Sequence, residues 1–319
     1  MRPLRLTLCH VLIILSFVAS AQNEVSPIFQ SEPRPIPSSV QIESGLRLET
    51  YFASLKPGGI GLLRLSGSGI LKASAEFRGK VFPFFAGDDE AQYALVAADM
   101  NTAAGTYTLT VLVEGDAGDV IFARELRLQA ASFITQALKL TGERAYLASA
   151  EIETREYARL DALTAISAAE PLWDATGFEL PHASELTTPF GAFRVLNNER
   201  RTRHTGWDQN VPSGTPIRAL AAGEARFAGP LELRGNYVLI DHGLGIFSGY
   251  AHFSELLVHG SQRVEAGQVI GLSGNTGRSS APHLHWEIVY AGEWVDGLAF
   301  LDLWLPSPRG ANARASAQS

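Results

Sequence analysis

The stretch PHLHWEIV at residues 282–289 has the pattern of a β-strand with two unlike faces. Side chains alternate along a strand, so His283 and His285 project to one side while Leu284 and Trp286 project to the other. We expect the apolar side to face a core and to hold the two imidazoles rigidly side by side. Burying two histidines without polar partners is costly. The stretch therefore predicts a sheet carrying a histidine-based site, with two exposed, functionless histidines as the alternative.

Two upstream stretches add residues that are suited to metal chemistry. In HTGWD, His204 and Asp208 lie four residues apart, and Gly206 between them favours a tight loop over a helix. The two side chains could reach one ion, or they could be an incidental surface pair. In YAHF, His252 lies between aromatic residues and by itself reads as a structural histidine. Three nitrogen or oxygen ligands plus a water form the arrangement of a catalytic zinc site.

These stretches belong to a longer series of motifs, and residues 189 to about 301 resemble the lysostaphin/LytM-type zinc metallopeptidases of peptidase family M23. Many members of that family cut cell-wall peptides. The motifs occur in the family's order: FG at 190–191 with Arg194, HTGWD at 204–208, GTPIRA at 214–219, NYV at 236–238, DHG at 241–243, YAH at 250–252, VEAGQVIG at 264–271, GNTG at 274–277 and HLHWE at 283–287.

The resemblance implies a role for each residue of the constellation. His204, Asp208 and His285 match the ligands of a Zn²⁺ ion, while His252 and His283 match two catalytic histidines that do not bind it. Zinc lowers the pKa of a bound water toward about 7 and polarises a peptide carbonyl. One neutral imidazole can take the proton of the water, and the other can stabilise the oxyanion or protonate the leaving amine. The sequence does not say which histidine does which.

The N-terminus reads as an export signal. Arg2 and Arg5 precede an apolar run at 6–19, and the small-residue pattern ASA at 19–21 predicts a signal peptide over residues 1–21. An uncleaved anchor is the alternative. Cleavage would remove Cys9, the only cysteine, and would leave 24 basic and 33 acidic side chains with a net charge of −9. This predicts a periplasmic or extracellular, cell-wall location, with no transmembrane span in the mature chain. The acidic balance argues against a nucleic-acid partner.

The rest of the chain predicts a mainly β protein in several parts. A Pro- and Ser-rich linker covers 22–40, and alternating strands over 41–133 indicate an immunoglobulin-like β-sandwich that serves as a spacer or docking module. Apolar residues at helical spacing predict a helical connector over 148–171. A metallopeptidase domain, an antiparallel β-sheet with a groove, follows over 180–306, and residues 307–319 form a disordered tail.

Together these features predict an exported zinc-dependent endopeptidase that acts on peptide cross-links of peptidoglycan. The alternative from another functional class is a catalytically inactive protein of the same fold that binds the wall or activates an amidase. A complete set of His204, Asp208, His252, His283 and His285 argues against that alternative. A third possibility, compatible with catalysis, is a latent enzyme whose groove is covered by its own N-terminal half.

Overall fold

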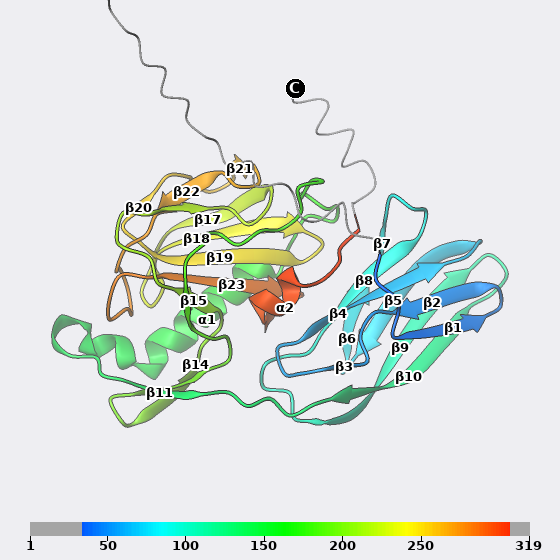
Figure 1. The fold of residues 1–319 in the computed structure, drawn as a ribbon, viewed down its shortest axis with the longest axis horizontal. Coiled ribbons are helices and arrows are strands. Elements are labelled where there is room, and N and C mark those ends of the chain that lie inside the picture. Colours follow the sequence, from blue (N-terminus) through cyan, green and yellow to red (C-terminus); the bar gives the residue numbers. More distant parts are fainter. Residues whose placement is uncertain (1–33, 307–319) are drawn as a thin grey trace, which may run out of the picture.

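Two β-rich parts lie side by side in the computed structural model, which describes residues 34–306 (Figure 1). The predicted signal peptide, most of the predicted linker and the predicted tail lie outside these residues. Within 34–306, none of the helices has the length and apolarity that crossing a bilayer requires. The chain is mainly β, as the sequence indicates.

The N-terminal part is a pair of five-stranded sheets packed face to face. Alternation explains the packing, because Leu109, Val111 and Val113 of one strand are buried, whereas Thr110 and Leu112 between them are partly or largely exposed. The immunoglobulin likeness stays a prediction. The first sheet has the order β1 (Ser39–Glu43), β2 (Leu46–Thr50), β4 (Ile60–Ser66), β8 (Gln92–Ala97), β7 (Phe85–Ala86), and the second has the order β3 (Ser54–Leu55), β10 (Val120–Leu128), β9 (Gly105–Gly115), β5 (Ile70–Phe77), β6 (Lys80–Pro83).

The C-terminal part is built on an eight-stranded antiparallel sheet. Its central strands are buried along their whole length, which indicates that both faces are covered. The order is β12 (Leu186–Thr188), β15 (Trp207–Gln209), β23 (Leu284–Tyr290), β19 (Ile246–Phe253), β18 (Gly235–Gly243), β17 (Gly223–Leu231), β21 (Arg263–Val264), with β24 (Glu293–Val295) beside β23.

Two small sheets and three helical segments complete this part. One small sheet joins β16 (Pro216–Arg218), β22 (Val269–Leu272) and β20 (Glu255–Leu256). The other joins β11 (Thr135–Leu138), β13 (Phe193–Leu196) and β14 (Arg200–Arg203), and in it β11 runs parallel to β13. The helical segments are η1 (Gly142–Ala148), a 3₁₀-helix, α1 (Ala150–Thr164) and α2 (Gly297–Leu301).

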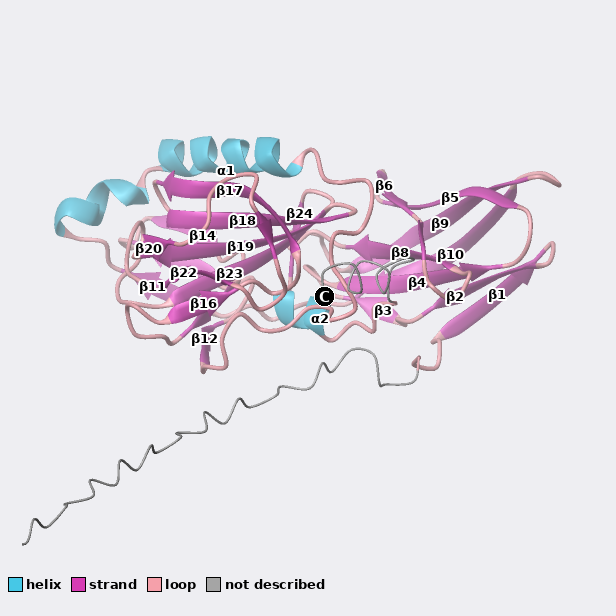
Figure 2. Cartoon of the chain, turned by 90° about the horizontal axis from the view of Figure 1, so that it is seen from above, coloured by secondary structure: helices cyan, strands magenta, loops and turns pink. Residues whose placement is uncertain are grey.

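Helix α1 packs on the C-terminal sheet and does not run free between the two parts (Figure 2). The Ser149 hydroxyl caps its first turn by accepting from the backbone N–H of Glu151 and Ile152. Leu160 is buried against residues of the sheet, and the Tyr157 ring lies 5.2 Å from that of Trp294. The segment expected to be a connector therefore contributes its apolar face to the C-terminal core.

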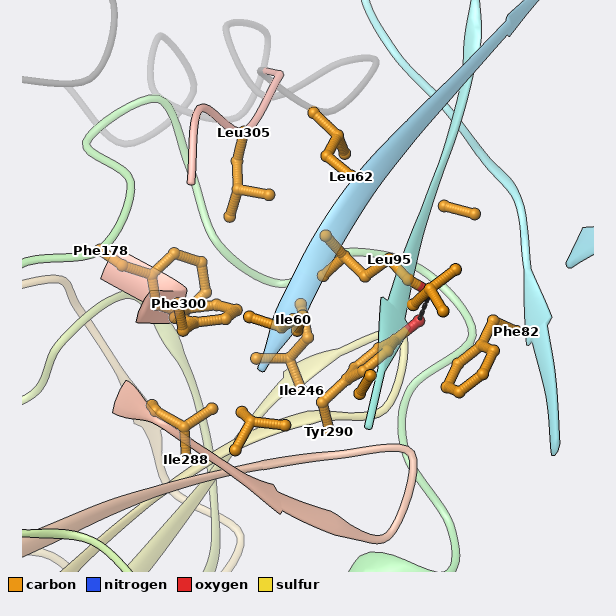
Figure 3. Packing of buried hydrophobic residues seen from close by; sticks show 14 of the residues in the cluster. Ile60, Leu62, Phe82, Leu95, Phe178, Ile246, Ile288, Tyr290, Phe300 and Leu305 are labelled. Carbon is orange, nitrogen blue, oxygen red and sulfur yellow. Dashed lines mark hydrogen bonds between the residues drawn. The ribbon is translucent and has the colours of Figure 1, made fainter. Parts of the chain in front are cut away.

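The two parts share one hydrophobic core (Figure 3). Ile60, Leu62 and Leu95 of the sandwich pack in the same cluster as Ile246 and Ile288 of the C-terminal sheet. At this boundary the Tyr290 hydroxyl donates to the Leu95 carbonyl at 3.1 Å, and its ring stacks on Phe82 at 5.7 Å. A continuous apolar core places the sandwich at a fixed position beside the C-terminal sheet.

Candidate metal centre

The three predicted metal ligands meet at one buried point. Strands β15 and β23 pair in a register that sets Asp208 opposite His285, and His204 lies just ahead of β15. The distance to Asp208 Oδ1 is 2.9 Å from His204 Nε2 and 2.9 Å from His285 Nδ1, and the two nitrogens lie 2.8 Å apart. One donor atom from each residue lies within 4.8 Å of the other two.

Gly206 makes this convergence possible, because the chain between the first two ligands lies directly on β23. A Cβ at this position would come within 2.0 Å of the Trp286 carbonyl oxygen, a distance that no side chain can adopt. Beneath that carbonyl, the Trp286 ring is fully buried in the core. The glycine thus permits the close approach, and the tryptophan anchors the strand that carries His285.

Hydrogen bonds on the far side of each ring set which nitrogen faces the centre. His204 Nδ1 lies 2.9 Å from the Pro189 carbonyl, so it carries the proton and leaves a lone pair on Nε2. His285 Nε2 faces Glu287 Oε2 at 3.3 Å, so it carries the proton and leaves a lone pair on Nδ1. Both lone pairs therefore point toward Asp208.

The electrostatics of this group fit a bound cation. Burial, and then the positive charge of Arg194, lower the pKa of His204 to about 4. Burial alone would raise the pKa of Asp208, but His204 and Arg194 hold it well below its usual range. Burial also opposes the charged form of His285, yet hydrogen bonds to Asp208 and Glu287 outweigh it and raise the pKa. Two buried nitrogen lone pairs and a carboxylate oxygen within 3 Å form a donor set that zinc accepts.

The two other predicted histidines lie beside this group. The His252 and His283 rings are 4.6 Å apart, and His283 Nε2 is 3.6 Å from Asp208 Oδ1. Each ring donates its Nδ1 proton to a carbonyl, His252 to Thr276 and His283 to Ala281, both at 2.8 Å. Each Nε2 thus keeps a lone pair. Burial is the main reason that the pKa values of both rings lie below the ordinary histidine value, so both are neutral at pH 7.

An irregularity in the sheet aims His252 at the centre. The pairing of β18 with β19 shifts between Asn236 and Val238, and His252 takes a left-handed backbone conformation with φ of 65°. Its N–H donates to the Arg234 carbonyl at 2.8 Å. A left-handed conformation costs a residue with a side chain about 1–2 kcal/mol. Bulges of this kind commonly redirect a side chain near an active site, and the sequence pattern gave no sign of this one.

A cavity of about 500 Å³ is lined by two of the five residues, Asp208 and His283, and is the candidate for the predicted groove. One side is β11, from the segment that leaves the sandwich, and the other is the loop at 278–283. Its lining has three cations, Lys139, Arg194 and Arg278, and Asp208 is the one acid among the lining residues. The sequence pattern does not indicate the role of β11 or of Lys139, because both are separated from most of the other lining residues by more than forty-five residues of the chain.

Comparisons with known proteins find similarity in the C-terminal part. A profile of Peptidase family M23 matches residues 202–297. The peptidoglycan DD-endopeptidase ShyA of Vibrio cholerae is 35% identical over 136 residues, which cover 40% of this chain and 32% of that protein. The chain spans about a third of the length of the curated relatives that it matches.

Solved structures extend the likeness beyond this segment. A protein from Pseudomonas aeruginosa described as a candidate peptidase M23 is 26% identical, with a TM-score of 0.58, over 77% of this chain and 94% of that one. The catalytic domain of lysostaphin from Staphylococcus simulans is 31% identical over 38% of this chain and 93% of that one, with a TM-score of 0.35. The match to the Pseudomonas protein covers most of the residues described here.

Proposed function

We propose that this chain, whose residues 202–297 match the profile of Peptidase family M23, is an exported, zinc-dependent endopeptidase that hydrolyses peptide cross-links of bacterial peptidoglycan. The observation that carries the proposal is the buried group of His204, Asp208 and His285, flanked by two neutral imidazoles at the end of a groove. The name of the Vibrio relative, a peptidoglycan DD-endopeptidase, supports this substrate class.

The residues divide the chemistry among themselves. His204, Asp208 and His285 would hold the zinc ion, which when bound supplies Lewis acidity and lowers the pKa of a water toward about 7. His252 and His283 are neutral and each has a free Nε2 lone pair, so one can accept the proton of the attacking water. The other can donate a hydrogen bond to the developing oxyanion or deliver a proton to the leaving amine once it is protonated.

Arg194 keeps Asp208 in place for this role. One of its guanidinium N–H groups donates to Asp208 Oδ2 at 2.6 Å, which leaves Oδ1 directed at the two histidine nitrogens. A charge-assisted bond of this kind fixes the carboxylate and keeps it ionised. Arg194 also lines the groove, so it can orient the ligand and contact a substrate.

The free edge of β11 suits an extended peptide. The carbonyls of Ile134 and Leu138 accept from N–H groups of the β13 segment, so the backbone of Ala137 faces the opposite way. An extended substrate can add to such an edge through main-chain hydrogen bonds. Within residues 34–306, Lys139 is exposed and forms no ion pair, so it is available to a carboxylate on the peptide.

The test compares the mature chain, residues 22–319, with His285→Ala and His283→Ala on purified cross-linked muropeptides. We expect chelator treatment and His285→Ala to abolish cleavage and bound zinc together. We expect His283→Ala to reduce cleavage about 10²–10⁴-fold while zinc remains bound. His259→Ala, which alters an exposed loop histidine, is the matched control. Equal cleavage by all samples would contradict the zinc mechanism, and a parent protein without zinc would favour the inactive, wall-binding alternative.

Export is tested separately from catalysis. We expect the protein isolated from its native cell envelope to begin at Gln22, because the small residues at 19–21 form the predicted cleavage site. N-terminal sequencing measures this directly. A chain that begins at Met1 in the membrane fraction would instead indicate the uncleaved anchor.

A further inference from the structure

A buried series of charged residues, Glu156, Arg234 and Glu287, ends at His285 on the side of its ring that faces away from Asp208. Glu287, which faces His285, has no exposed side-chain surface. Arg234 donates to both oxygens of Glu287, from Nε to Oε1 at 2.8 Å and from Nη2 to Oε2 at 2.9 Å. A two-point contact of this kind fixes the plane of the carboxylate as well as its charge. The Tyr237 hydroxyl also donates to Oε1 at 2.8 Å and the Thr205 hydroxyl to Oε2 at 2.5 Å, so Arg234 is the charged member of three groups that orient Glu287 toward His285 Nε2.

Helix α1 holds Arg234 in turn. Glu156 Oε1 accepts from Arg234 Nη1 at 3.0 Å, and Glu156 Oε2 accepts from the backbone N–H of Leu233 at 2.6 Å. The guanidinium also lies 5.5 Å from the centre of the Tyr157 ring and 5.7 Å from that of Tyr237. The side chains of both Glu156 and Arg234 are more than nine-tenths buried, so water does not compete for these contacts.

The segment at 233–234 also holds His252. The Arg234 carbonyl accepts the N–H of His252, the residue with the left-handed backbone. Glu156 Oε1 additionally accepts the backbone N–H of Arg234 at 3.2 Å. One glutamate on α1 therefore anchors the segment that contacts His285 through a side chain and His252 through its main chain.

We propose that Glu156 and Arg234 are positioning residues of the metal centre: they act through Glu287 on His285 and through the Arg234 carbonyl on His252. Helix α1 lies outside residues 202–297, so the functional metal site extends beyond the segment that matches the family. The inference rests on the metal centre alone and is independent of which peptide is cut.

The physical reason is the requirement that His285 offer a lone pair on Nδ1. That tautomer persists only while Glu287 accepts the proton on Nε2. Without Glu156, Arg234 loses one of its two carboxylate partners. Of the three groups that orient Glu287, the charged one is then held less rigidly, while Tyr237 and Thr205 remain. Loss of such outer contacts commonly weakens metal binding 10- to 100-fold.

A neighbouring glutamate on the same helix provides a matched control. Glu153 is also buried and also forms ion pairs with arginines: its Oε2 lies 2.9 Å from both Arg200 and Arg278. Its Oε1 accepts from the Thr202 hydroxyl. None of these three partners bonds to the predicted metal ligands. Glu153→Gln and Glu156→Gln therefore remove similar charges from similar depths of one helix, and only the second lies on the path to His285.

The experiment measures the zinc dissociation constant of the mature chain by competition with a chromophoric chelator, in the absence of substrate. We expect Glu156→Gln to weaken zinc binding about 10-fold or more, while Glu153→Gln stays within about twofold of the parent although both lower Tm. Arg234→Lys, which cannot make the two-point contact, should weaken binding at least as much. The double variant Glu156→Gln/Arg234→Lys should bind zinc as Arg234→Lys does, because Glu156 acts through Arg234.

Two results would overturn the inference. One is unchanged zinc affinity in Glu156→Gln at a lowered Tm, which would make the contact purely structural. The other is an equal loss in Glu153→Gln. If Glu156→Gln does not fold, Glu156→Asp retains the charge at a shorter reach, and the visible spectrum of its Co²⁺ form reports the ligand geometry. An unaltered spectrum would also contradict the proposal. Because no substrate is present, either failure leaves the peptidase proposal standing.

Discussion

At the scale of single residues, each of the four histidines at the candidate metal centre owes its state to the group on the far side of its ring. A carbonyl holds one nitrogen of His204, His252 and His283, while a carboxylate holds one nitrogen of His285. The other nitrogen of each ring therefore keeps a lone pair that faces the centre. This division explains how four nearby imidazoles of the same residue type can serve as two ligands and two proton carriers.

His242 has both ring nitrogens occupied and is predicted to make stability depend on pH. It is fully buried between the Ala222 carbonyl and the Ser248 hydroxyl, and burial lowers its pKa to about 4. In the unfolded chain the pKa returns to about 6.5. Between these values the unfolded state binds a proton that the folded state does not. The contribution of His242 is therefore complete above pH 6.5 and is lost as pH falls toward 4, by about 3 kcal/mol.

Denaturant unfolding of the parent and of His242→Gln at several pH values measures this effect. The difference between their free energies of unfolding should shrink from pH 7 to pH 4, because the glutamine cannot take up the proton. A constant difference would mean that this ring does not titrate in the range stated.

At the scale of elements, local periodicity predicted the parts of the site that lie within one strand or one loop. The alternation at 282–289 predicted that Leu284 and Trp286 would face the core, and both are fully buried. Gly206 within 204–208 predicted a tight loop in place of a helix, and residues 204–206 form a loop that leads into β15. The helix predicted over 148–171 is observed at 150–164. These features depend on neighbouring residues, so a short window of sequence contains them.

Features that depend on contacts between residues far apart in the chain could not be predicted from a short window of sequence. Strand β11 pairs with β13, which sets Thr135 beside Phe193, and nothing in either segment specifies the other. The contact between Glu156 and Arg234 likewise joins a helix to a loop 78 residues away. Charged residues on an amphipathic helix usually face solvent, so a pattern alone assigns Glu156 to the surface. Tertiary packing reverses that assignment by placing Arg234 over it.

Strand β11 leads to a prediction about substrate binding. Ala137→Pro removes an N–H that faces the groove and leaves the pairing with β13 intact, because that pairing uses the neighbouring residues. Loss of one main-chain hydrogen bond to the peptide should raise KM about 2- to 10-fold with little change in kcat. Steady-state kinetics on cross-linked muropeptides give both constants. Ala137→Val keeps the N–H and should retain the parent KM; an equal increase would assign the effect to side-chain bulk.

At the scale of the whole molecule, the shared core determines how the sandwich and the C-terminal part depend on each other. Ile246 and Ile288, from strands that flank the metal centre, are buried against sandwich residues such as Ile60 and Leu95. A domain that could cover and uncover the groove would need a boundary that separates at little cost. Here separation would expose a set of large apolar side chains to water, at roughly 25 cal/mol per Å². The sandwich therefore serves as a fixed support, and the two parts should unfold together.

The distribution of tryptophan makes that cooperativity measurable. All five tryptophans, at 173, 207, 286, 294 and 304, follow the sandwich in sequence. Trp207, Trp286 and Trp294 lie in strands of the C-terminal sheet and report that part, whereas Trp173 and Trp304 pack on Phe85 and Tyr93 of the sandwich. Leu126 is fully buried in β10 of the sandwich. Leu126→Ala should cost about 3–5 kcal/mol and lower Tm by roughly 5–15 °C. With one cooperative unit, tryptophan fluorescence and circular dichroism must shift by the same amount, although the substitution lies outside the sheet that carries Trp207, Trp286 and Trp294. Leu71→Ala, at an exposed position of β5, should leave both transitions in place.

A fluorescence midpoint that stays at the parent value while circular dichroism shows an earlier transition would mean that the sandwich unfolds independently. The core at Tyr290 would then be too weak to hold the sandwich in a fixed position beside the groove.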